Sequence, residues 1–167
     1  ARHLLEALGD AEAVFTEKRQ SLEKIPGIGD SIITEIKRAD VLLRAEKELA
    51  FAQKNGISIY FLKDMNYPER LRECPDAPVL FYFKGNADLN AAHIISVVGT
   101  RRASTYGQEV TERLLRDLSV IFPDLLVVSG LAYGIDICAH RNALNTQLPT
   151  VGVLAHGLDR IYPPVHR

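Results

Sequence analysis

The sequence predicts an α/β protein in which a small helical domain precedes a parallel sheet. In the second part of the chain, short apolar runs at 94–98, 125–128 and 150–154 alternate with segments of helical periodicity. Strands that alternate with helices in this way form a parallel sheet with right-handed crossovers. In the first part, the periodic segments have helical spacing, and the composition changes near Gly56. We therefore expect a helical domain at 1–56 and an α/β domain at 57–167.

Helical signals fill the first domain. Leu4, Leu5 and Leu8 share one helical face, and Gly9 is expected to end that helix. Asp10 is expected to cap the next helix, because its carboxylate can accept hydrogen bonds from unpaired N–H groups. Further helices are predicted at 11–15, 21–25, 30–38 and 39–55.

A glycine-rich turn, Ile25-Pro26-Gly27-Ile28-Gly29, joins two of these helices and resembles the hairpin of a helix-hairpin-helix motif. Two glycines let the backbone turn tightly and point N–H groups outward, where a phosphate can bind. The alternative is a purely structural hairpin with the same turn. The nearly balanced charge of this segment favours the structural alternative.

The elements of the second domain follow from the same patterns. The runs ISIYFL (57–62) and VLFYFK (79–84) predict two strands, separated by a loop at 64–76 with a helical turn at 68–72. The helices that connect the three later strands are predicted at 107–121 and 137–145.

Each of the three later strands ends in a turn that contains glycine, at 99–104, 129–136 and 156–163. In a parallel sheet these turns lie along one edge, where such sheets bind their ligands. The first turn combines Arg101 and Arg102 with the positive end of a helix, which is an arrangement that attracts anions. The alternative is an ordinary turn with solvated arginines, and the convergence of three turns favours the anion site.

Composition narrows the classes of function. The 167 residues fit one or two domains, and 47% hydrophobic with 25% charged residues predicts a packed core. The net charge of −1 gives no overall attraction to nucleic acid or membrane, so any DNA binding must come from a local patch. The sequence shows no membrane span, signal peptide or metal-ligand spacing. Cys74 and Cys138 are expected to be free thiols.

Several motifs resemble the DNA-processing protein A family (DprA, also called Smf). They are VVGTRRASTYG at 97–107, SGLAYGIDICAHRNAL at 129–144 and TVGVLAHGLDRIYPPVH at 150–166, in the order and spacing of that family. The segment 66–86 resembles the approach to its Rossmann-like domain. The helical part with IPGIG resembles its small SAM-like, helix-hairpin-helix domain. The resemblance implies a Rossmann-like sheet with helices on both faces.

The resemblance also implies a function. Family members are expected to be non-enzymatic, cytoplasmic, homodimeric proteins that bind single-stranded DNA and load the recombinase RecA in natural transformation. No cofactor, metal ion or membrane contact is expected. The chain begins within a helical segment and its one Met is internal, so we expect a piece of a longer protein. The family continues into the rest of the Rossmann-like domain and often a winged helix, neither of which is present here.

The candidate DNA-binding residues come from the three turns. Arg101 is the first candidate for a phosphate contact, because the guanidinium fork suits a pair of oxygens. The glycines could let DNA approach the backbone, although simple turn formers would look the same. The full candidate set is Gly99, Thr100, Arg101, Arg102, Ser104, Ser129, Gly130, Gly134 and Arg160.

Other polar residues near the turns have less specific roles. Asp136 fits a helix cap better than a catalytic acid, and His140 is expected to be a packing residue rather than a base. Arg141 is a further candidate for lining the groove. Tyr106 and Tyr133 could stack on bases, because every base has a π face, but core packing explains them equally well.

Two enzyme classes compete with the binding function. The first is a Rossmann-like nucleotide phosphoribohydrolase of the lysine-decarboxylase-like type, which shares the first glycine turn. That class also needs a PGGxGT-type loop with a catalytic Glu, which these residues lack. The second is a dinucleotide-dependent enzyme, which is disfavoured because no GxGxxG follows any strand. Ser129 has no GxSxG context, so a hydrolase elbow is not indicated.

Overall fold

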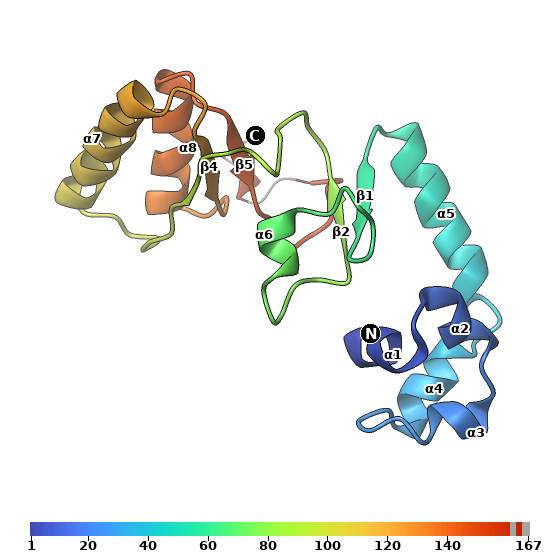
Figure 1. Cartoon of the computed structure of the whole chain (residues 1–167). Helices are drawn as coiled ribbons and strands as arrows, with labels where there is room; N and C mark the ends of the chain where they lie inside the picture. Colours follow the sequence, from blue (N-terminus) through green and yellow to red (C-terminus); the bar gives the residue numbers. More distant parts are fainter. Residues whose placement is uncertain (161–162, 165–167) are drawn as a thin grey trace. The chain divides into compact units, whose positions relative to one another are not determined.

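The computed structural model describes residues 1–160 and 163–164. These residues fold into two compact units. The first unit contains residues 1–67 and 71–83, and the second contains 68–70 and the residues from 84 onward. The short helix α6 (Glu69–Arg72) includes residues of both units. Figure 1 shows the course of the chain through its helices and strands.

The first unit begins with five helices. They are α1 (Arg2–Leu8), α2 (Ala11–Thr16), α3 (Arg19–Leu22), α4 (Asp30–Ile36) and α5 (Val41–Lys54). Leu4, Val14, Leu22 and Ile33 form their buried core, with partly buried leucine and isoleucine side chains packed against it. One apolar residue in each of α1 to α4 thus holds four short helices together, because a helix of one or two turns is not stable by itself. Most of α5 is exposed, and only Ala52 is buried.

The end of α1 and the start of α2 follow the sequence prediction. Gly9 has a φ of 90°, which a residue with a side chain rarely adopts. The Asp10 carboxylate accepts a hydrogen bond of 2.8 Å from the Ala13 amide, so the predicted cap of α2 is confirmed.

A two-stranded antiparallel sheet completes the first unit. Its strands are β1 (Ser58–Phe61) and β2 (Leu80–Phe83). Tyr60 stacks on Phe81 with ring centroids 5.0 Å apart, and the buried Tyr67 meets Phe81 edge-on. These strands pair with each other and belong to the same unit as the helices. The first compact unit therefore includes this hairpin and ends at Phe83.

The second unit contains the three predicted parallel strands. They are β3 (Ile94–Ser96), β4 (Leu126–Ser129) and β5 (Thr150–Gly152), in the spatial order β3-β4-β5. Ile95 lies opposite Val127, and Val128 lies opposite Val151. The prediction of adjacent parallel strands is confirmed, and their carboxyl ends share one edge.

The helices α7 (Thr105–Ile121) and α8 (Ile135–Asn145) connect these strands and pack against each other. Their core includes Leu115 and Ala139 against Val127. Both helices lie on one face, because a strand order without reversal places successive crossovers of the same hand on the same side. The two connecting helices therefore cover one face of the sheet (Figure 1), whereas the sequence predicted helices on both faces.

The core of the second unit makes a stability prediction. Leu115 is fully buried, whereas its neighbour Leu114 is 43% exposed on the same helix. Leu115→Ala should lower the free energy of unfolding by about 2–5 kcal/mol, because it leaves a cavity. Leu114→Ala is the matched control and should change it by less than about 1 kcal/mol. Urea denaturation followed by circular dichroism measures both. Equal effects would contradict the described packing of α7.

Candidate nucleic-acid interface

The turn between β3 and α7 keeps two arginines at the surface. The Arg102 amide donates to the Thr100 hydroxyl at 3.2 Å. The Ser104 hydroxyl accepts from the Gly107 amide at 3.2 Å and so caps α7. Arg101 and Arg102 are exposed. The hydroxyl groups of the turn thus accept hydrogen bonds from its own backbone, whereas its guanidinium groups stay exposed and can contact a ligand.

The turn between β4 and α8 is bonded to the first turn. The Ser129 hydroxyl donates to the Val97 carbonyl at 2.6 Å, and Ser129 is buried. The Ile135 amide donates to the Thr100 carbonyl at 3.1 Å. We refer to residues 97–104 and 129–135 as the paired turns. Because Ser129 has given its one hydroxyl proton to Val97, it has no donor left for a ligand.

Glycines allow the paired turns to approach closely. A Cβ on Gly134 would overlap the Thr100 carbonyl and the Arg101 backbone, and Gly134 has a φ of 81°. A Cβ on Gly99 would lie 2.6 Å from the Ile135 side chain. These two glycines are therefore explained by the contact between the turns, an explanation that does not require DNA. Ile135 was not among the predicted residues, because it has no signal of its own beyond its place after Gly134.

A Cβ on Gly130 would likewise overlap the Asp136 carboxylate. The buried Asp136 accepts from the Ala132 amide at 3.4 Å, and its Oδ1 has no partner among the described atoms. The prediction that Asp136 caps α8 is wrong, because the N-cap residue is Gly134. Asp136 lies in the first turn instead, where a carboxylate is favoured by the helix dipole.

His140 holds the end of β4 to β5. Its ring nitrogens lie 2.7 Å from the Thr150 hydroxyl and 2.6 Å from the Gly130 carbonyl, and the residue is buried. The prediction of a packing histidine is confirmed. Cys138, on the same helix, is a free thiol whose pKa is raised by burial, so it is protonated near neutral pH.

The third turn reaches the same edge after β5. The Val153 amide donates to the Ser129 carbonyl at 2.8 Å, which ties the start of this turn to β4. Arg160 is exposed at its far end. Residues 161–162 of the predicted turn lie outside the described residues. Sheet topology thus brings the start of the third turn beside the paired turns.

Unpaired positive charge distinguishes this edge from the glycine hairpin of the first unit. Within residues 1–160 and 163–164, the guanidinium groups of Arg101, Arg102 and Arg160 have no hydrogen bond or ion pair. Around the hairpin, Lys24 is also exposed and without a partner among the described residues, but Arg19 pairs with Asp30, and the Lys37 ammonium donates to the carbonyls of Phe15 and Glu17. The edge of the three-stranded sheet is therefore the better candidate for binding a polyanion.

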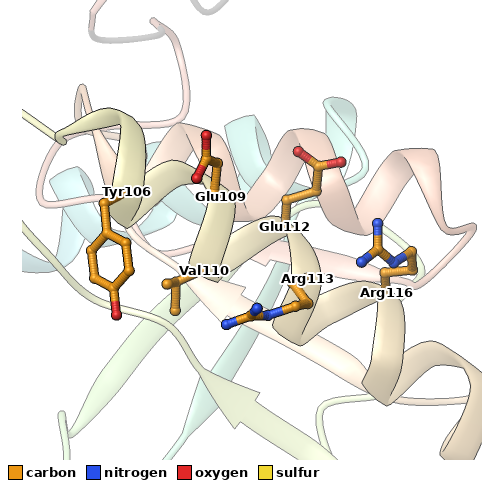
Figure 2. A pocket seen from close by; sticks show the side chains of 6 residues that line it. All are labelled: Tyr106, Glu109, Val110, Glu112, Arg113 and Arg116. Atoms are coloured by element: carbon orange, nitrogen blue, oxygen red, sulfur yellow. The ribbon is translucent and has the colours of Figure 1, made fainter.

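A shallow hollow of about 270 Å³ lies on the outer side of α7 (Figure 2). Its lining mixes acidic and basic side chains and is formed by Tyr106, Glu109, Val110, Glu112, Arg113 and Arg116. Glu109 and Glu112 would repel phosphate, so we do not assign phosphate binding to the part of this hollow that they line; Tyr106 lies at its other end, in the first turn of α7. In the described part of the chain, no cluster of three His, Cys, Asp or Glu residues suits a metal ion, and no helix has the length and apolarity to cross a membrane.

The contact between the paired turns makes a second prediction. Gly134→Ala should destabilise the protein by at least about 1 kcal/mol, because it combines a left-handed φ with overlap on the Thr100 carbonyl. Gly152→Ala is the matched control, since Gly152 lies in the same unit, has no positive φ, and a Cβ on it would lie 4.0 Å from its nearest neighbours. Thermal unfolding measures both variants. An unchanged melting temperature for Gly134→Ala would show that the turns are not packed as described.

Most of the chain is similar to known proteins. Residues 58–167 match the family model described as DNA recombination-mediator protein A. The chain is 40% identical over 108 residues to DNA processing protein DprA of Streptococcus pneumoniae, an alignment that covers 65% of this chain and 37% of that protein. It is 44% identical over 99 residues to the putative DprA of Mycobacterium tuberculosis, covering 58% and 25%.

Structural similarity gives the same relationship. The X-ray structure of DprA from Streptococcus pneumoniae matches with a TM-score of 0.61 and 32% identity, covering 81% of this chain and 49% of that chain. The chain thus spans only about 25–37% of the length of these curated relatives. By its family model, its relatives and its α/β fold, the chain belongs to the DNA recombination-mediator protein A (DprA/Smf) family, whose members function in DNA processing and recombination.

Proposed function

We propose that this chain binds single-stranded DNA at the carboxyl edge of the sheet β3-β4-β5. The observation that carries the proposal is the set of exposed guanidinium groups of Arg101, Arg102 and Arg160, which have no partner among the described residues. The chain as a whole has a net charge of −1. Binding of a polyanion therefore requires a local concentration of unpaired cations, which the consecutive residues Arg101 and Arg102 supply.

Among the predicted site residues, the proposal gives direct phosphate contact to the arginines. Backbone N–H groups at the start of α7 add to them, because the first amides of a helix have no partner within it. Thr100 and Ser104 shape the turn through their hydroxyl groups. Gly99, Gly130, Gly134 and Ser129 support the site from within, since they pack or bond the turns together.

The same proposal extends to the biological role. Membership of the DprA/Smf family and the match to DprA of Streptococcus pneumoniae support a role in recombination. On the family resemblance we propose that the protein loads RecA onto single strands during natural transformation, acts as a homodimer and works in the cytoplasm. We also propose that residues 1–56 form a SAM-like domain. The family match that begins at residue 58 supports that boundary.

We propose further that the protein is not an enzyme. Three side chains have catalytic potential. The side chains of Ser129 and His140 form hydrogen bonds within the fold, and burial raises the pKa of the Cys138 thiol, which keeps it protonated. Release of free base from nucleoside monophosphates by the full-length protein would instead support the phosphoribohydrolase class.

Arg101→Ala tests the DNA site. Loss of one charge-assisted phosphate contact should weaken binding by about 1.5–3 kcal/mol. The slope of log affinity against log salt should become shallower by about 0.7, the contribution of one phosphate of a single strand. The loss should be equal for oligo-dT and a mixed-sequence strand, because phosphates carry no sequence information. Fluorescence anisotropy of the full-length protein across a range of salt concentrations measures all three quantities.

The matched control is Arg116→Ala. Arg116 is exposed on α7 beside Asp117 and away from the turn, and its loss should leave both affinity and slope nearly unchanged. If the folded Arg101→Ala variant binds like the original protein, or if Arg116→Ala has the same effect, the arginine turn is not the DNA site.

A further inference from the structure

Two tyrosines are exposed at the sheet edge that carries the arginines. Tyr106 is 74% exposed in the first turn of α7, and Tyr133 is 49% exposed in the turn before α8. Neither side chain belongs to the core cluster of this unit. The sequence left open whether these rings pack in the core or face a ligand, and their exposure excludes core packing.

Both tyrosines are held in place by the contact between the paired turns. Tyr133 directly precedes Gly134, which packs on the backbone of Thr100 and Arg101. Tyr106 directly precedes Gly107, whose amide donates to the Ser104 hydroxyl and on which a Cβ would lie 3.5 Å from the Ile135 side chain. The backbone next to Tyr133 thus packs on that of Arg101, and the backbone next to Tyr106 is tied to the same turn through Ser104.

An exposed aromatic ring beside an unpaired guanidinium suits a ligand that is both anionic and aromatic. A single strand of DNA offers phosphates together with free base faces, and any base can stack on a tyrosine. In a duplex the base faces are stacked within the helix and are not accessible to these rings. The two side-chain types together therefore favour single strands, which arginines alone would not do.

We propose that Tyr106 and Tyr133 stack on unpaired bases of the strand whose phosphates Arg101 holds. This inference rests on the proposed function and adds the source of its preference for single strands. Val98 and Val153 are also exposed at this edge, but an aliphatic side chain has no π face on which a base can stack.

The test compares two ligands of equal length and equal phosphate number, oligo-dT and an abasic strand. The variants are Tyr106→Leu and Tyr133→Leu, which remove a ring, and Tyr106→Phe and Tyr133→Phe, which keep one. Each Leu variant should lower the affinity for oligo-dT about five- to hundredfold and leave the affinity for the abasic strand unchanged. The Phe variants should bind both strands as the original protein does. Circular dichroism verifies that each variant is folded.

Two controls separate this inference from the proposed function. Arg101→Ala should lower the affinity for both strands, because both carry phosphates. Tyr82→Leu is the matched control, since Tyr82 is a 44% exposed tyrosine on β2 in the other unit, and it should change neither affinity. The chain contains six Tyr and no Trp, so oligo-dT should also quench tyrosine fluorescence, whereas the abasic strand should not.

The outcomes are distinct. If the Leu variants bind oligo-dT like the original protein while Arg101→Ala weakens both strands, base stacking is refuted and the DNA site stands. If the Leu variants weaken both strands equally, the tyrosines do not act through bases, and the inference fails. If the original protein binds neither strand, the proposed function fails and the inference fails with it.

Discussion

The candidate site depends on one contact between two turns. The Ile135 amide donates to the Thr100 carbonyl, and Gly134 lets the two backbones meet. This contact fixes the backbone of Arg101 at the carboxyl edge of the sheet. Because the guanidinium group is carried by a rigid turn, less conformational entropy is lost when it binds a phosphate than would be lost from a mobile loop. The same contact brings the backbone next to Tyr133 against the backbone of Arg101.

The glycine hairpin of the first unit and the edge of the three-stranded sheet differ in how far their positive side chains are paired. Near the glycine hairpin, Arg19, Lys37 and Arg38 are engaged by carboxylates or carbonyls. Such exposed ion pairs contribute little to stability, but they neutralise the local field that a phosphate would meet. At the sheet edge, Arg101 and Arg102 keep their charge free. In a chain with a net charge of −1, this difference is why we propose the sheet edge, and not the hairpin, as the DNA site.

The sequence predicted the three parallel, adjacent strands correctly, because β-branched runs that alternate with helices favour a parallel sheet with right-handed crossovers. It predicted the cap at Asp10 but not at Gly134, since a buried carboxylate in the first turn, Asp136, gives the same local signal as a cap. It named Gly99 and Gly134 as glycines that could let DNA approach the backbone, whereas the structure shows that they let the two turns approach each other. Glycine that admits a neighbouring chain and glycine that admits a ligand look identical in sequence, and the partner residue Ile135 lies 36 positions from Gly99. The hairpin β1–β2 groups with the helices in the first compact unit, whereas the family match begins at residue 58, so the boundary near Gly56 stays a prediction.

The most direct measurement of the DNA site is amide hydrogen exchange of the full-length protein, with and without saturating oligo-dT. If DNA binds at the sheet edge, exchange should slow in the paired turns, residues 97–104 and 129–135, and in the first turn of α7. The glycine hairpin at 25–29 should exchange at the same rate in both states. Slowed exchange confined to the hairpin and α4, with unchanged rates in the paired turns, would contradict the assignment of the DNA site to the sheet edge.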